Sequence, residues 1–159
     1  MEYVHLHKVD KEKLEAFFRE HWGSSQMVIS SGVYQCDSLP GYACLADEHQ
    51  IIGLVTYVDR EGEREIISLD SIVEKRGIGS NLMELVESEA SQLNIPKITL
   101  ITSNDNIDAL KFYQKRGYRM MAILKDAIEK ARIIKPEIPL VGFYGIPIKD
   151  EILLEKPLR

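Results

Sequence analysis

The segment Gly77-Ile78-Gly79 carries the clearest chemical signal in this sequence. It lies between a strand-like run and a helix-like run, and glycine lets a ligand approach the backbone without a Cβ in the way. A helix leaves its first four N–H groups unpaired, so the amides from Arg76 to Ser80 and the positive end of the helix dipole could hold a diphosphate. Lys75 and Arg76 add positive charge at the same place.

The spacing of the glycines separates the ligand classes that use such turns. A nucleoside triphosphate loop needs G-x-x-x-x-G-K-[ST], which is absent, and a dinucleotide fingerprint needs a third glycine or alanine where this chain has Leu82. Taken alone, the turn fits a helix start that binds nothing as well as it fits a phosphate site.

Two motifs together give a more specific indication. The run from Glu74 to Gly79 resembles the [RQ]-x-x-G-x-[GA] motif of the GCN5-related N-acetyltransferase (GNAT) superfamily, with Glu74 where arginine or glutamine is usual. The run from Asn106 to Tyr118 resembles the superfamily's N-x-x-A-x-x-F-Y-x-x-x-G-[FY] motif on the following helix. The similarity is clear over residues 50–125, and the two motifs stand in the expected order.

The resemblance implies acetyl-CoA as co-substrate and assigns residues to it. The glycine turn would hold the diphosphate, the strand backbone around Leu69–Ile72 would pair with the pantetheine arm, and Asn106 would contact that arm. Asn106 can equally serve as a simple helix cap. The full set expected to bind the cofactor is Leu69, Ser71, Ile72, Lys75, Arg76, Gly77, Ile78, Gly79, Ser80, Asn106 and Phe112.

The resemblance also places the hydroxyl of Tyr113 beside the thioester sulfur, as proton donor to the departing thiolate. A packed core tyrosine is the alternative. The attacking amine must lose a proton, because an amine with a pKa near ~10 is mostly charged at neutral pH. Glu65 opens a Glu-Ile-Ile run similar to the Glu-Ile-Val run of histone-type members, although one residue out of register, and Asp70 is a rival base nearer the turn.

Strict alternation along this strand puts Glu65 and Asp70 on opposite faces, whereas a bulge, usual in the superfamily, would swap the faces. Either acid can also be an ordinary solvated strand position. The base therefore stays open between the two.

The surrounding pattern predicts an α+β (α/β three-layer) fold: one mixed, mainly antiparallel sheet of six to seven strands with helices on both faces. Residues 1–159 form a single GNAT-like domain in this interpretation. Residues 24–40 show mainly an irregular pattern. Strands are expected at 3–8, 42–46, 50–59, 63–71, 97–102, 118–124 and 148–155, and helices at 11–22, 80–93 and 126–134. A further helix runs to Lys115 and can be capped by Asn104, Asp105 or Asn106.

The composition excludes several functional classes. The chain has 159 residues, 45% hydrophobic and 28% charged, with a formal net charge of −5, so a basic nucleic-acid surface is not expected. No apolar run reaches the ~18–20 residues of a membrane span, and the N-terminus lacks a signal-peptide pattern, so we expect a cytoplasmic protein.

No metal site is expected. Cys36 and Cys44 do not have metal-ligand spacing, and His5 and His7 share a strand face without a third ligand nearby.

The sequence thus predicts an N-acetyltransferase that moves an acetyl group from acetyl-CoA to a primary amine, with a small-molecule acceptor favoured. A protein N-acetyltransferase and a non-catalytic acyl-CoA sensor are the alternatives; Tyr113 favours an enzyme and Glu74 the sensor. The resemblance implies that Trp22-Gly23 and residues 27–40 and 134–147 lie where the acceptor site is built. Homodimers are common among resembling proteins, and the sequence leaves this open.

Overall fold

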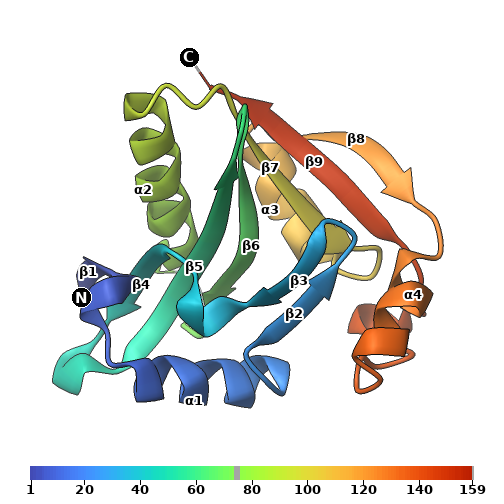
Figure 1. Ribbon diagram of the computed structural model, residues 1–159, viewed down its shortest axis with the longest axis horizontal. Coiled ribbons are helices and arrows are strands. Elements are labelled where there is room, and N and C mark those ends of the chain that lie inside the picture. The colour runs from blue at the N-terminus through green and yellow to red at the C-terminus, as the bar shows by residue number, and fades with distance from the viewer. Residues whose placement is uncertain (74–75, 159) are drawn as a thin grey trace.

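A seven-stranded mixed sheet organises the molecule, as the computed structural model shows for the described residues 1–73 and 76–158 (Figure 1). The strand order is β1-β4-β5-β6-β7-β9-β8, and every neighbouring pair is antiparallel except β6 with β7. This confirms the expected mixed, mainly antiparallel sheet. The strands are β1 (Glu2–His5), β4 (Gly41–Leu45), β5 (Ile51–Arg60), β6 (Glu63–Ser71), β7 (Lys97–Ser103), β8 (Arg119–Leu124) and β9 (Glu151–Pro157).

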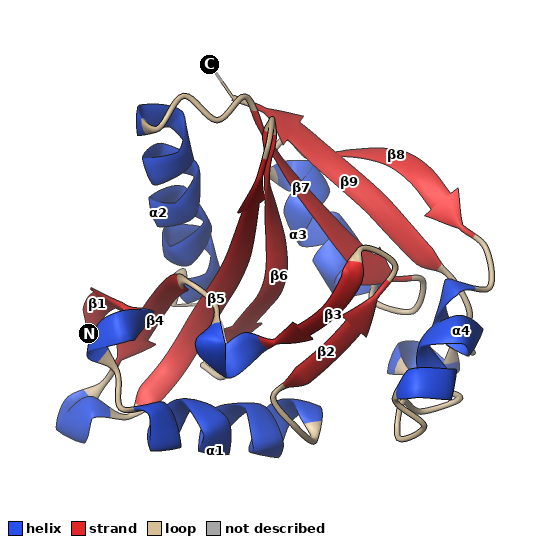
Figure 2. Cartoon of the chain, in the orientation of Figure 1, coloured by secondary structure: helices blue, strands red, loops and turns tan. Residues whose placement is uncertain are grey.

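Helices cover both faces of this sheet (Figure 2). One buried cluster joins the sheet to α2 (Ile78–Gln92) and α3 (Ile107–Lys115), and a second cluster joins the opposite face to α1 (Lys11–Trp22). The fourth helix, α4 (Ala127–Ile134), contacts the short strand β2 (Gln26–Ile29). The expected layers are confirmed.

Helix α1 forms where the capping residues and apolar spacing predict it. The Asp10 carboxylate accepts a hydrogen bond from the Glu12 amide at 2.9 Å, which satisfies one of the unpaired donors of the first turn. Leu14, Phe17 and Phe18 are buried along one side of the helix. The helix ends at Trp22, so this residue lies at the edge of the α1 layer.

Two predicted strand boundaries differ from the structure. The first strand ends at His5 rather than at residue 8, because the buried Leu6 starts a 3-10 turn over Leu6–Lys8. The last strand covers Glu151–Pro157 rather than 148–155, since Val141 and Pro147 form a separate bridge just before it.

The segment 24–40 is the main correction, because it contains a hairpin where an irregular segment was expected. Strands β2 and β3 (Gly32–Gln35) form their own two-stranded sheet. The hairpin tip is anchored by partners far away in sequence: the Ser30 hydroxyl donates to Glu151 at 2.5 Å and the Ser31 hydroxyl donates to Glu65 at 2.7 Å. Such long-range anchors are not visible in local spacing.

Strand β6 contains a bulge that decides which side chains face α1. Thr56 pairs with Ser68 and Tyr57 pairs with Ile66, so Ile67 is an extra residue on β6. Strict alternation is therefore wrong for this strand, and the bulge that we considered is present. Glu65 and Asp70 lie on one face as a result, the face of the hairpin and α1.

Strands β6 and β7 separate shortly after they pair. Their register joins Arg64–Ile66 to Ile98–Leu100 and goes no further among the described residues. From Ile67 to Ser71 the side of β6 that faces β7 is thus without a strand partner in the described chain. The sheet is split at this point, and the split opens beside the start of α2.

Candidate active site

A groove of about 450 Å³ brings the two sequence motifs and the end of β6 together. Of the residues expected to bind a cofactor, Leu69, Ser71, Gly77, Ile78, Gly79, Ser80, Asn106 and Phe112 line it. Its other walls are Val73, Asp108, Ala109 and Tyr113. Residues that lie forty positions apart in the chain therefore share one surface.

The glycine turn at the start of α2 lines this groove. Gly77 has φ 70° and ψ 14°, a left-handed conformation that favours glycine, and it caps α2 without a side-chain hydrogen bond. The Asn81 amide donates to the Gly77 carbonyl at 2.9 Å and so marks the first turn of the helix. The amides of Ile78, Gly79 and Ser80 precede it, and no described residue accepts a hydrogen bond from them, so they can bind an anion.

Three expected cofactor residues lie elsewhere or outside the described chain. The Ile72 amide donates to the Ile52 carbonyl at 3.0 Å, and its side chain borders a different pocket beside α1. Arg76 is exposed and does not line the groove. Lys75, together with Glu74, lies outside the described residues.

Gly53 on β5 has no side chain, which lets the glycine turn pack closely against this strand. A Cβ built on Gly53 would lie 2.4 Å from Cγ2 of Ile78 and 3.3 Å from Cδ1 of Leu82. The first turn of α2 therefore rests directly on the β5 backbone. This close packing sets where the free amides point.

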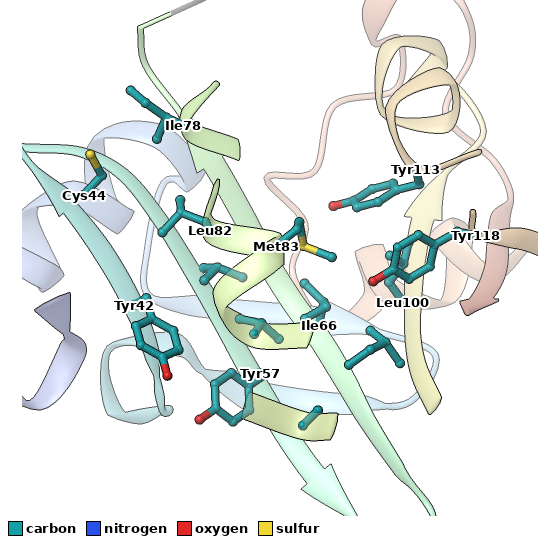
Figure 3. Packing of buried hydrophobic residues seen from close by; sticks show 14 of the residues in the cluster. Tyr42, Cys44, Tyr57, Ile66, Ile78, Leu82, Met83, Leu100, Tyr113 and Tyr118 are labelled. Atoms are coloured by element: carbon teal, nitrogen blue, oxygen red, sulfur yellow. The ribbon is translucent and has the colours of Figure 1, made fainter. Parts of the chain in front are cut away.

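Tyr113 lies on the α2–α3 side of the split. Its side chain is buried and reaches from α3 toward Met83 of α2, with edge-on ring contacts to Phe112 and Tyr118 (Figure 3). Within the described part of the chain, no residue makes a hydrogen bond to its hydroxyl. Burial, and then the charge of Asp70, raise the pKa of Tyr113, so it stays protonated at neutral pH.

Asn106 performs the capping role that the sequence left open. Its side-chain oxygen accepts a hydrogen bond from the Ala109 amide at 3.2 Å, and Asn106 also lines the groove. The cap uses the side-chain oxygen and not the donors of the carboxamide.

Asp70 lies on the opposite, α1 side of the sheet. The Trp22 indole nitrogen Nε1 donates to Asp70 Oδ2 at 2.9 Å. Burial raises the pKa of the Asp70 carboxyl to about 6, against the opposing effects of the Trp22 hydrogen bond and of His21. The group is therefore mainly a carboxylate at neutral pH, yet a much better proton acceptor than an ordinary aspartate.

The hydrogen bonds of Glu65 suit a structural role better than a role in proton transfer. It is 2% exposed, and its carboxylate accepts from Arg60 Nη1 at 2.5 Å and from the Ser31 hydroxyl at 2.7 Å. Arg60 also donates to the Tyr34 hydroxyl. Both carboxylate oxygens of Glu65 are thus occupied by protein donors, and this network ties the hairpin to β6.

Trp22 was expected at the acceptor site, together with Gly23, but its contact with the candidate base was not predicted. The hydrogen bond to Asp70 spans 48 positions in the chain. As the only tryptophan of the chain, in the expected acceptor region, Trp22 offered a weak signal.

The comparisons with known proteins agree with this geometry. The family model described as "Acetyltransferase (GNAT) family" matches residues 7–118. The chain belongs to the GNAT family of acetyltransferases. It is an acyltransferase, and the resemblance seen in the two motifs is confirmed.

Several relatives of this GNAT acetyltransferase are close. The uncharacterized protein YxbD of Bacillus subtilis (strain 168) is 55% identical over 152 residues, 96% of each chain. A GNAT family acetyltransferase from Elizabethkingia anophelis, solved with acetyl-CoA bound, is 25% identical with a TM-score of 0.66 and covers 76% of this chain and 77% of its own. A Bacillus subtilis acetyltransferase in complex with CoA has a TM-score of 0.69 at 19% identity, covers 99% of this chain and 98% of its own, and supports the fold.

The described residues of the acetyltransferase contain neither a candidate membrane-spanning helix nor a candidate metal site. None of their helices combines the length and apolar character needed to span a membrane. No group of three or more His, Cys, Asp or Glu side chains among them has the arrangement of a metal site.

Proposed function

We propose that this acetyltransferase moves the acetyl group of acetyl-CoA to a primary amine of a small molecule, with Asp70 as base and Tyr113 as acid. One observation carries the proposal. Asp70 lies on the α1 face of the part of β6 that has no described strand partner, and Tyr113 lines the groove on the other face. After burial, the charge of Asp70 contributes to the raised pKa of Tyr113. A thioester lying in the split would have a proton acceptor on one side and a proton donor on the other.

The groove supplies the cofactor side of the reaction. The free amides at the start of α2 and the helix dipole suit the diphosphate. The unpaired side of β6 at Leu69 and Ser71 suits the amide groups of a pantetheine arm, which can pair with it as a strand would. Acetyl-CoA bound in the Elizabethkingia anophelis relative supports this choice of cofactor.

The chemistry follows from the two side chains. Asp70 takes a proton from the amine, whose nitrogen attacks the carbonyl carbon of the thioester. The tetrahedral intermediate then collapses, the carbon–sulfur bond breaks, and the Tyr113 hydroxyl gives its proton to the departing thiolate. The nitrogen loses its second proton, which restores the Tyr113 hydroxyl, and Asp70 releases its proton to solvent. The products are an acetylated amine and CoA with a free thiol.

The hairpin supports a small acceptor. Its tip bonds both to Glu65 on β6 and to Glu151 on β9, so it spans the split on the Asp70 side. This narrows the approach to Asp70, which is easier for a small amine than for a folded protein. Two buried free cysteines, Cys36 and Cys44, together with a CoA thioester substrate, fit a reducing compartment such as the cytoplasm.

The test is a thiol-release assay with acetyl-CoA across a panel of small amines, amino acids and peptides, paired with calorimetry of CoA binding. We expect CoA binding, and thiol release that depends on at least one small amine. Asp70→Asn should lower kcat/KM by about 100-fold or more, the usual effect of removing a general base. CoA binding without thiol release from any amine would contradict the proposed reaction, and release with peptides alone would contradict the small acceptor.

A further inference from the structure

The end of α1 holds a chain of contacts that leads from a buried lysine to Asp70. Lys135 follows α4 and is 5% exposed. Its ammonium group donates to the Trp22 carbonyl at 3.1 Å and to the Gln26 carbonyl at 2.7 Å. The indole of the same Trp22 donates to Asp70 at 2.9 Å.

A buried lysine without an ion pair needs a specific reason, because burial disfavours its charge. Among the described residues Lys135 forms no salt bridge, and burial lowers its pKa. The carbonyls it binds lie at the C-terminal end of α1 and at the start of β2, and a cation at a helix C-terminus is stabilised by the dipole. Lys135 therefore fixes the short connection that carries Trp22.

Trp22 needs this support to hold a defined position. Its side chain is 37% exposed, so packing alone does not fix the indole. The other groups that act on Asp70 or feel its charge are His21 on α1, Tyr113 on α3 and the thiol of Cys36. Only Trp22 donates a hydrogen bond to the carboxylate among the described residues.

We propose that Trp22 is the positioning residue of the catalytic base, and that Lys135 holds Trp22 in place. The indole N–H orients one oxygen of Asp70 and leaves the other for the amine. It also favours the carboxylate over the carboxylic acid, so it extends activity toward lower pH. The inference rests on the proposed function, since it takes Asp70 as the base.

The first test is a pH profile of kcat/KM for Trp22→Phe, which keeps an aromatic ring and removes the donor. Loss of the hydrogen bond makes the carboxylate easier to protonate, so the acid limb of the profile moves to higher pH. Because a hydrogen bond to a charged group contributes about tenfold or more, we expect kcat/KM to fall about tenfold at pH 6 and to stay within about threefold of wild type above pH 8. An equal loss at every pH would indicate a merely structural role and would overturn the inference.

Lys135 is tested in the same assay. Lys135→Met should move the acid limb in the same direction, and Lys135→Arg, which keeps donors for the two carbonyls, should restore it. Lys97→Met removes a lysine at the start of β7 that pairs with Glu155 on β9, and it should leave the profile unchanged. A Lys135→Met profile identical to wild type would overturn the assigned role of Lys135.

A second readout does not depend on activity. Trp22 is the only tryptophan of the chain, so intrinsic fluorescence reports on this site alone. In a His21→Gln background, the emission should change with a midpoint near pH 6 as Asp70 titrates, and the change should vanish in His21→Gln/Asp70→Asn. A transition that persists without Asp70 would overturn the contact. Absence of thiol release from the wild type would contradict the proposed function, while this titration would still decide the geometry.

Discussion

The carboxylate of Asp70 is held in surroundings that oppose its charge. Burial is the largest influence on it, and a single indole donor offsets that influence only in part. Groups that are poised for proton transfer often have such unfavourable surroundings, because the protein tunes the pKa toward the working pH. The same surroundings have a consequence for stability.

We predict that Asp70→Asn stabilises the fold at neutral pH. The folded-state pKa of about 6 lies above the ordinary value of 3.8, so the contribution of this group to stability is full below pH ~4 and is lost as the pH rises through 6. The difference corresponds to at most ~3 kcal/mol, and partial exposure reduces it to about 1–2 kcal/mol. Denaturant unfolding at pH 7.5 should show this gain, and unfolding at pH 4 should show almost none.

The control for this prediction is Glu129→Gln at an exposed position of α4, which should leave the free energy of unfolding nearly unchanged at both pH values. If Asp70→Asn does not raise the free energy of unfolding at pH 7.5, or raises it equally at pH 4, the buried carboxylate does not destabilise the fold.

Tyr113 and Tyr118 form a natural pair for separating catalysis from packing. Tyr113→Phe removes a hydroxyl that no described residue binds, so we expect kcat to fall about 100-fold while stability and the KM for acetyl-CoA change little. Tyr118→Phe removes a hydroxyl that donates to Glu87 at 2.7 Å, so we expect a loss of about 1–2 kcal/mol with turnover retained. Steady-state kinetics and thermal unfolding of both variants check this, and unchanged turnover in Tyr113→Phe would contradict its role as acid.

At the scale of elements, the glycine turn can be tested against a second glycine of similar conformation. Gly77 and Gly62 have φ of 70° and 81°, and a Cβ on either would meet nothing within 4 Å. Alanine at either position should therefore cost about 1 kcal/mol of left-handed strain. Only Gly77→Ala should also weaken CoA binding, by about tenfold, because only its amides line the groove.

Calorimetric titration with CoA and thermal unfolding of these two variants test whether the glycine turn binds the diphosphate. Equal affinity in Gly77→Ala and Gly62→Ala would show that the turn does not hold the diphosphate. As the internal control, both variants should lose the same amount of stability, so that a difference in CoA affinity does not come from unfolding.

The elements show what local spacing can and cannot predict. The glycine turn, the capped helices and the antiparallel order of β4, β5 and β6 depend on neighbours in sequence, and each was predicted close to its observed position. The hairpin of β2 and β3 was missed, because its tip is held by Glu65 and Glu151, far away in sequence.

The candidate base shows the same limit within one strand. Glu65 and Asp70 could both be identified as acids near the site, but only the extra residue Ile67 decides that they share a face. The partner Trp22 is a tertiary contact, and no local pattern could supply it. Our proposal of Asp70 rather than Glu65 as the base therefore depends on the tertiary contacts.

At the scale of the whole molecule, the groove joins parts of the sheet that are otherwise weakly connected. A cofactor lying along β6 and the start of α2 would contact α3 as well, and a ligand that binds only the folded state stabilises it. At about 100 times its dissociation constant, CoA should add about 2.7 kcal/mol, or roughly 5–10 °C in Tm for a chain of this size. Differential scanning fluorimetry measures this; a shift no larger than that of Gly77→Ala would contradict binding at the glycine turn.

The separation of β6 from β7 also bears on self-association. Unpaired strand edges usually invite another polypeptide to add a strand, and proteins commonly block them with charges or cover them. Here the open edge lies in the interior of the sheet, with α3 behind it and the hairpin in front (Figure 1). A slender, non-peptide arm can reach this edge from the groove, whereas a second polypeptide strand with side chains on both faces cannot. In the proposed mode of cofactor binding, the split thus provides strand-like pairing for the pantetheine arm without creating an aggregation surface.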